Sequence, residues 1–226
     1  MKHSSLTVIL PTFNEKDNVI PLMVAIKKHT PSNTTIIVVD DNSPDGTAKK
    51  VQSFINSHQS NGRAQLLLRT THRGLTNSLN AGIANAQSDI IIWMDCDFSH
   101  PAFVLPKLLS AIHKGADIAL ASRIHNQGLS ILLNNIAMLF FGKKITDYTT
   151  GFLAVQKTVL DHIPLRGNYG EYCIDLLVRA QAAKYRIKEI PYTSPPRLHG
   201  VSKTMPFRQG YGYIMTIVRL LWTSGK

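Results

Sequence analysis

The chain has 226 residues, with 25 lysines and arginines against 14 aspartates and glutamates, and a formal net charge of +11. This length fits a single domain with a well-buried core, over residues 1–226. The charge favours anionic partners: nucleic acid, a membrane surface or phosphorylated small molecules. Cys96 and Cys173 form no Cys-x-x-Cys motif and no Cys/His cluster, which argues against a disulfide framework and a zinc site and for a reducing cytoplasm. No apolar stretch reaches the roughly 20 residues of a membrane span, and none resembles a signal peptide.

Short β-branched runs alternate with helix-length amphipathic segments in the first half of the chain. The runs are continuous in apolar residues, as in strands that are buried on both faces of a mostly parallel sheet. We expect strands over residues 6–10, 34–39, 64–68, 89–94 and 117–122, and helices over residues 17–29, 45–57, 76–86 and 102–113. The pattern predicts an α/β fold with helices on both faces. A Walker loop and a Gly-x-Gly-x-x-Gly motif are absent, which disfavours P-loop hydrolysis and ordinary dinucleotide binding.

Two details of the helices can be predicted. If Asp17 caps the first helix, Pro21 falls in the first turn, where backbone N–H groups have no helical partner. After about residue 123 the pattern loosens, and we expect a strand over 151–157, a helix over 171–184 and a strand over 186–192. On that helix, Asp175 is expected to pair with Arg179 at i+4. No linker rich in Gly, Pro or Ser divides the chain.

Acidic side chains follow the predicted strands, where open parallel sheets bind their ligands. They are Glu15, Asp40, Asp41, Asp95 and Asp97. An apolar strand that delivers Asp95 and Asp97 at i and i+2 predicts a clamp for a hard divalent cation, Mg²⁺ or Mn²⁺, bound through oxygen. The natural ligand of such a cation is a diphosphate leaving group. We expect Asp40 to hold a nucleoside, and Asp41 to order its loop or accept a backbone N–H.

Other polar residues allow two interpretations. Asp45 is expected to be a turn or cap residue. Arg197 and Lys203 flank "LHGVS", which could fold over a phosphate, since arginine suits bidentate phosphate contact; a solvated basic loop is the alternative. His100 and His199 lie beside turns and are expected to be hydrogen-bonded parts of the structure.

The segment 206–226 carries aromatic and aliphatic side chains among Arg208 and Arg219. It is too short to span a bilayer, but its composition fits a helix at the membrane interface. An ordinary helix that packs on the core is the alternative.

Six motifs occur in a characteristic order: "VILPTFNE", "IIVVDDNSPDGT", "IIIWMDCDFSHP", "ASR", "DYTTGF" and "RLHGVSK". With them the chain resembles the family 2 glycosyltransferases of the GT-A fold, and within that family the dolichyl- and polyprenyl-phosphate mannose synthases. The resemblance implies a nucleotide-sugar-binding half over about 1–123, an acceptor half over about 124–205, and metal-dependent transfer of mannose from GDP-mannose to a dolichyl or polyprenyl phosphate.

The resemblance also implies residue roles. Donor contacts fall on Pro11, Phe13, Glu15, Val38 and Asp40, with Cys96 beside the substrate; metal ligation on Asp95, Asp97 and Ser99; and diphosphate or acceptor-phosphate contact on Arg123, Arg197 and Lys203. Asp97, Arg197 and Lys203 are the residues implied in catalysis. Phe13 stands where the family usually has Tyr, and Cys96 where Ala is common.

A phosphate acceptor is already an anion and needs no general base, and in-line attack would invert an α-linked donor. Three alternatives stay open: a UDP-sugar enzyme acting on a polyprenyl phosphate or a glycan hydroxyl, a nucleotidyltransferase, and a nucleic-acid-binding module. The last rests on charge alone, and because the basic residues are scattered we expect no nucleic-acid partner. We expect peripheral contact with the cytoplasmic face of a membrane, and a membrane-anchoring partner protein stays open.

Overall fold

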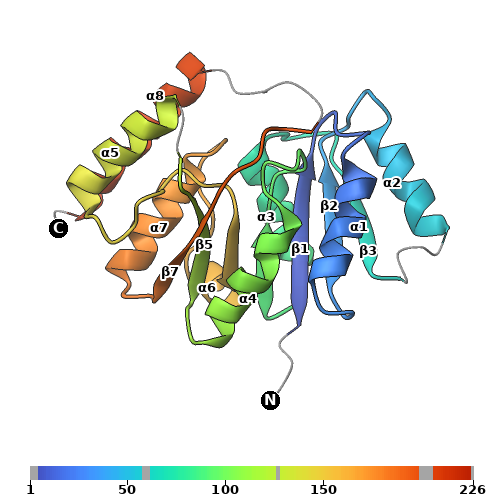
Figure 1. The fold of residues 1–226 in the computed structure, drawn as a ribbon. Coiled ribbons are helices and arrows are strands. Elements are labelled where there is room, and N and C mark those ends of the chain that lie inside the picture. Colours follow the sequence, from blue (N-terminus) through green and yellow to red (C-terminus); the bar gives the residue numbers. More distant parts are fainter. Residues whose placement is uncertain (1–4, 58–61, 126–127, 199–205, 225–226) are drawn as a thin grey trace.

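The computed structural model describes residues 5–57, 62–125, 128–198 and 206–224, which contain one seven-stranded sheet of order β3-β2-β1-β4-β6-β5-β7 (Figure 1). The strands are β1 (Leu6–Thr12), β2 (Thr35–Asp40), β3 (Ala64–Leu68), β4 (Ile90–Trp93), β5 (Ile118–Arg123), β6 (Leu153–Gln156) and β7 (Ile187–Tyr192). Neighbouring strands are parallel except at β6, which is antiparallel to both β4 and β5. The predicted α/β fold with a mostly parallel sheet is confirmed.

The helices are α1 (Val19–His29), α2 (Thr47–Asn56), α3 (Leu75–Asn85), α4 (Leu105–His113) after a 3₁₀ turn (Ala102–Val104), α5 (Leu129–Phe141), α6 (Lys157–His162), α7 (Tyr172–Ala182) and α8 (Pro206–Ser224). The sequence predicted all of these except α5 and α6. The expected cap of α1 was wrong, because Asn18 precedes the helix while Asp17 lies 3.8 Å from Lys50. Pro21 falls in the first turn, as expected.

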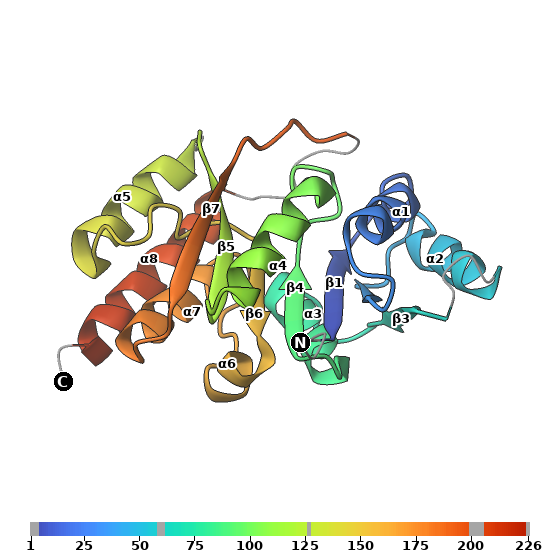
Figure 2. The same ribbon diagram turned by 60° about the horizontal axis from the view of Figure 1, so that its bottom comes forward.

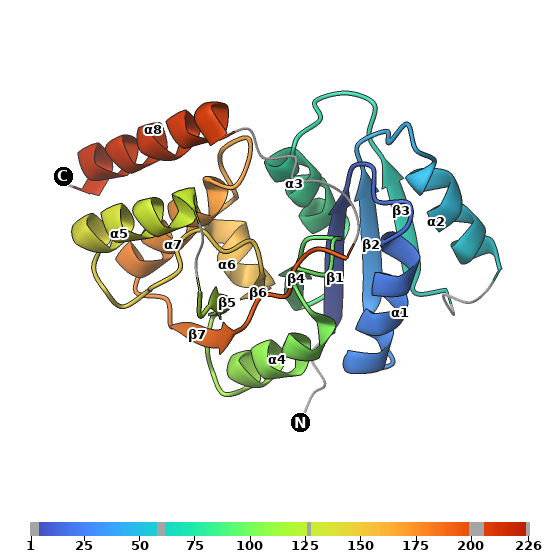
Figure 3. The same cartoon turned by 45° about the horizontal axis from the view of Figure 1, so that its top comes forward.

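Two layers of helices bury the two faces of the sheet, as Figure 3 shows for α1 and α4 on one side and α3, α6 and α7 on the other. Successive residues of β1 point to opposite layers: Val8 packs with α1 and α4, and Ile9 packs with α3. Gly82 lets α3 lie close to β1, since a Cβ there would come within 2.6 Å of Ile9 Cγ2. Burial on both faces explains the continuous apolar runs.

Helices α5 and α8 lie side by side at the end of the molecule far from α2 (Figure 2). Helix α8 is attached to α7 by the carboxylate of Asp175, which accepts hydrogen bonds from Arg179 Nε at 2.7 Å and from Arg219 Nη2 at 2.9 Å. The predicted i+4 pair is confirmed, and Arg219 adds a link to α8. No helix in the described ranges combines the length and the apolar character that crossing a bilayer requires.

Candidate active site

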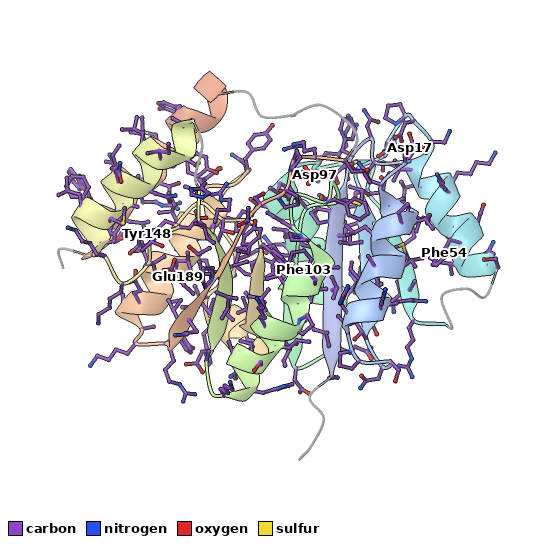
Figure 4. All side chains as sticks on the ribbon, in the orientation of Figure 1. Asp17, Phe54, Asp97, Phe103, Tyr148 and Glu189 are labelled. Carbon is purple, nitrogen blue, oxygen red and sulfur yellow. The ribbon has the colours of Figure 1, made fainter. Side chains whose placement is uncertain are left out.

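A cavity of about 840 Å³ opens at the carboxyl ends of the strands, beside Asp97 at the upper edge of the sheet in Figure 4. We call residues 11–78 of its lining the amino-terminal wall and residues 123–213 the carboxy-terminal wall, with the turn after β4 between them. The lining comprises Pro11, Thr12, Phe13, Glu15, Asp41, Arg73, Gly74, Leu75 and Ser78; then Asp95, Cys96, Asp97 and His100; then Arg123, Leu129, Ser130, Leu133, Thr149, Thr150, Gly151, Tyr169, Gly170, Tyr172, Arg197 and Tyr213.

The turn after β4 carries the two acids predicted to bind a metal. Asp97 Oδ1 accepts hydrogen bonds from the backbone N–H of Ser99 at 3.0 Å and from its hydroxyl at 2.5 Å. Asp97 Oδ2 lies 2.8 Å from Arg197 Nη1. Asp95 and Asp97 both line the cavity, whereas Ser99 does not and instead supports Asp97.

These residues fit a hard divalent cation only in part. Two carboxylates supply the oxygen ligands that suit Mg²⁺ or Mn²⁺. In proteins, Mg²⁺ is commonly held by one or two carboxylates together with substrate phosphates. In the described part of the chain no three His, Cys, Asp or Glu side chains gather as a complete metal site. Asp95 and Asp97 would therefore hold the cation together with the oxygens of a diphosphate.

His100 fixes the shape of the same turn. Its Nδ1 accepts the backbone N–H of Asp95 at 2.9 Å, and its ring stacks on Phe152 at a centroid distance of 5.0 Å. Burial lowers the pKa of His100, against the opposing charge of Asp95. The imidazole is therefore neutral at pH 7. The prediction that His100 is a hydrogen-bonded part of the structure is confirmed. His199 lies outside the described residues.

The lowered pKa of His100 predicts a pH dependence of stability. Unfolding exposes the imidazole, which regains its ordinary pKa near 6.5. The unfolded state then binds a proton that the folded state does not, so stability falls as the pH drops below about 6.5, by at most about 1.4 kcal/mol per pH unit for one proton. His100→Phe, which keeps a ring on Phe152, should lose less stability than the wild type between pH 7.5 and 5.5 in urea unfolding. Equal losses in both proteins would contradict this role.

Asp41 organises the amino-terminal wall. Its carboxylate accepts the backbone N–H of Gly74 at 2.7 Å, Arg69 Nη1 at 2.9 Å and the hydroxyl of Ser78 at 2.8 Å. Gly74 has a φ of 133°, in a region that side chains rarely adopt. Of the two predicted roles of Asp41, acceptance of a backbone N–H is confirmed, and that N–H belongs to Gly74, before α3, rather than to the loop after β2.

Asp40 points away from the cavity. Its carboxylate is fully buried and accepts the Thr12 hydroxyl at 2.8 Å and the Ser43 backbone N–H at 2.8 Å. Val38 is buried in the core of the sheet. Neither residue is part of the cavity lining, so contact of Asp40 or Val38 with a nucleoside stays a prediction.

Other predicted positions do line the cavity: Pro11, Phe13, Glu15, Cys96, Arg123 and Arg197. Lys203 lies outside the described residues. Asp45 has the predicted turn role, because its carboxylate accepts the backbone N–H groups of Thr47 at 2.9 Å and Lys16 at 3.0 Å.

The sequence reasoning missed most of the carboxy-terminal wall. Thr149 and Gly151 belong to "DYTTGF", a motif that the sequence singled out without assigning roles to its residues. Ser130 and Leu133 lie on the unpredicted helix α5. Tyr213 reaches the cavity from α8, and no local pattern signals that contact because it depends on how α8 packs against the rest of the chain.

A mostly parallel sheet with one antiparallel strand, and a pair of acids after the strand beside β1, has the architecture of the GT-A glycosyltransferases. The crystal structure of glucosyl-3-phosphoglycerate synthase from Mycobacterium tuberculosis in complex with Mn²⁺, UDP and phosphoglyceric acid superposes with a TM-score of 0.79, at 15% identity, covering 97% of this chain and 79% of that one. A complex of the same enzyme with Mg²⁺ and UDP gives a TM-score of 0.78 at 14% identity, with coverage of 97% and 80%.

The family model for glycosyl transferase family 2 matches residues 7–162. A dolichol-phosphate mannosyltransferase of Pyrococcus furiosus is 30% identical over 98% of this chain and 65% of its own length. A polyprenol monophosphomannose synthase of Mycolicibacterium smegmatis is 34% identical over 87% of this chain and 79% of its own length. The chain belongs to glycosyltransferase family 2. It spans about two thirds of the length of the archaeal relative.

Proposed function

We propose that the protein is a metal-dependent, inverting glycosyltransferase that moves mannose from GDP-mannose to a dolichyl or polyprenyl phosphate. The names of the archaeal and mycobacterial relatives support this activity. The residues that line the cavity support this activity independently. The cavity contains both acids and arginines, so a donor diphosphate and an anionic acceptor could be held next to each other.

The turn after β4 and the amino-terminal wall would bind the donor. Asp95 and Asp97 would hold Mg²⁺ or Mn²⁺ against the diphosphate. When bound, that cation neutralises the charge that develops on the departing nucleoside diphosphate. Pro11, Phe13 and Glu15 line the wall beside this turn, where the nucleoside would lie.

The acceptor phosphate would bind at the carboxy-terminal wall. Arg123 and Arg197 offer guanidinium groups, which suit bidentate phosphate contact. Among its described lining residues there is no carboxylate and no imidazole. A sugar hydroxyl would need a general base at this place, whereas a phosphate monoester attacks as an anion. This composition favours a lipid phosphate over a glycan hydroxyl as the acceptor.

An apolar surface on α5 and α8 would meet the membrane that holds the lipid. Helix α5 has no charged residue, and both helices expose large apolar side chains: Ile131, Leu132, Leu139 and Phe140 on α5, and Tyr211, Ile214, Met215, Val218 and Trp222 on α8. Surfaces of this kind mark interaction sites, and the exposed Lys143 and Lys144 at the end of α5 would attract anionic lipids. We therefore propose peripheral binding at the cytoplasmic face of a membrane.

The donor preference can be tested by thermal protection. A ligand that binds only the folded state raises the melting temperature by mass action. With Mn²⁺ present, GDP-mannose should stabilise the protein more than UDP-glucose at equal concentration, and EDTA should remove the difference. Stronger protection by UDP-glucose would overturn the choice of donor and leave the transferase assignment standing.

Arg197→Ala should separate acceptor binding from donor binding. We expect the KM for polyprenyl phosphate to rise about tenfold or more, because a charge-assisted contact to phosphate is lost. The affinity for Mn²⁺ and GDP, measured by calorimetry, should not fall, because removing the guanidinium that lies 2.8 Å from Asp97 Oδ2 leaves that carboxylate free for the cation. Arg186→Ala removes a guanidinium that pairs with Asp117 at the opposite edge of the sheet and is the control. A loss of nucleotide affinity in proportion to turnover would show that Arg197 serves the donor.

A further inference from the structure

Arg123 is held in the cavity wall by a buried carboxylate. Asp147 Oδ2 accepts Arg123 Nε at 2.8 Å and the Arg123 backbone N–H at 3.0 Å, and Oδ1 accepts Nη2 at 2.8 Å. Nη2 also donates to the Thr149 hydroxyl at 2.7 Å. Within the described residues Nη1 has no hydrogen-bond partner, so it is the nitrogen left for a ligand in the cavity. The other two nitrogens fix the plane of the guanidinium.

Arg123 and Asp147 are both charged in the folded protein. Burial acts to raise the pKa of Asp147, but hydrogen bonds and the charge of Arg123 lower it, and the net direction is downward. Burial likewise acts to lower the pKa of Arg123, and Asp147 raises it with a net upward direction. Asp147 is fully buried and itself cannot touch a substrate. Its effect on the cavity passes through Arg123.

A third residue completes the arrangement from helix α5. Asn134 is 2% exposed, and its Nδ2 donates to Asp147 Oδ1 at 3.1 Å. Its Oδ1 is buried without a hydrogen-bond partner among the described residues. An unsatisfied amide oxygen inside an apolar helix costs stability that an aliphatic side chain would not. A role in stability alone therefore does not account for an asparagine at this place.

We infer that Asn134 and Asp147 are positioning residues that hold Arg123 in the orientation that receives the acceptor phosphate. Asn134 restrains Asp147, and Asp147 restrains the guanidinium plane, so that Nη1 faces the cavity before the acceptor arrives. The inference rests on the proposed function for the identity of the phosphate. It also connects the apolar helix α5, which would lie on the membrane, to the residue that meets the lipid headgroup.

The first test is a double-mutant cycle that measures the KM for the acceptor. Asn134→Ala should raise the KM for polyprenyl phosphate about tenfold, with nucleotide affinity within about twofold of the wild type. Asn135→Ala, the same change at the exposed neighbouring residue, is the matched control. In an Arg123→Lys background, where no bidentate pair can form, Asn134→Ala should have little further effect, because the two residues act as one unit. Additive losses in the two backgrounds would overturn the inference.

The second readout uses the protein without substrate. The Arg123 Nε–H proton should exchange slowly with water in ¹⁵N NMR spectra, and at least about tenfold faster in Asn134→Ala, while Asn135→Ala matches the wild type. Unchanged exchange in Asn134→Ala would show that Asn134 does not restrain Arg123. This result does not depend on the reaction, so a failure of the transferase proposal and a failure of the positioning role can be told apart. Asp147→Asn, which keeps the shape of the side chain, should also speed exchange.

Discussion

Asp97→Asn should lower the rate of sugar transfer on the order of 100-fold or more while leaving the fold intact. The substitution removes the negative charge that would hold a divalent cation at the donor diphosphate, and electrostatic stabilisation of this kind contributes several kcal/mol to catalysis. The asparagine oxygen can still accept the backbone N–H of Ser99, which Asp97 accepts at 3.0 Å. The melting temperature should therefore change by only a few degrees, and Mn²⁺ should no longer strengthen GDP binding in calorimetry.

The control for this variant is Asp117→Asn. Asp117 also pairs with an arginine, 3.3 Å from Arg186 Nε, but it lies at the amino end of β5, on the far edge of the sheet. It should keep wild-type activity. Near-normal turnover of Asp97→Asn at saturating Mn²⁺ would contradict the role of Asp97 as a metal ligand.

Substituting Leu139 and Trp222 together by serine should reduce binding to anionic liposomes at least about tenfold. These side chains are 76% and 81% exposed, among the most exposed apolar residues of α5 and α8, so they contribute little to packing. Burying a large apolar side chain among lipid headgroups removes its surface from water, and full burial would stabilise the membrane-bound state by about 1.5–3 kcal/mol for each side chain. Co-sedimentation at low and physiological salt measures the loss.

The same double variant should retain transfer to a short-chain acceptor in detergent, since neither residue lines the cavity. Arg219 is unsuited to this test because its pairing with buried Asp175 attaches α8 to α7. If variant and wild type sedimented equally, or if neither sedimented, membrane docking through α5 and α8 would be wrong. The apolar surface would then bind a partner other than a membrane.

The strands and most helices could be predicted because their signals are local. The run "IIVV" of β2 is apolar without alternation, and that pattern alone indicates burial on both faces. Helix α5 was not predicted because "LSILLNNIAMLFF" carries no charged residue and only three polar ones, so it lacks the broad polar face by which an amphipathic helix is recognised. The place of β6 between β4 and β5 is a matter of chain topology, which no local pattern encodes.

The sequence predicted which turns form the candidate site, but not always which side chain of a turn faces the cavity. Asp40 and Asp41 are adjacent at the end of β2, and adjacent residues at a strand end point in different directions. The structure turns Asp41 to the cavity and buries Asp40 against Thr12 and Ser43. Asn134 and Tyr213 reach the site from α5 and α8 through packing between distant segments, so composition and spacing could not reveal them.

The most direct test of the central claim is the product of a single reaction. The purified protein is incubated with GDP-mannose, Mg²⁺ and a polyprenyl phosphate in detergent, and the lipids are analysed by mass spectrometry and by NMR of the anomeric proton. We predict a β-linked mannosyl phosphoryl polyprenol, released GDP in equal amount, no product with EDTA, and an initial rate at least about 100-fold lower with Asp97→Asn. The account would be contradicted by transfer to a glycan hydroxyl in place of the lipid phosphate, or by an undiminished yield in EDTA.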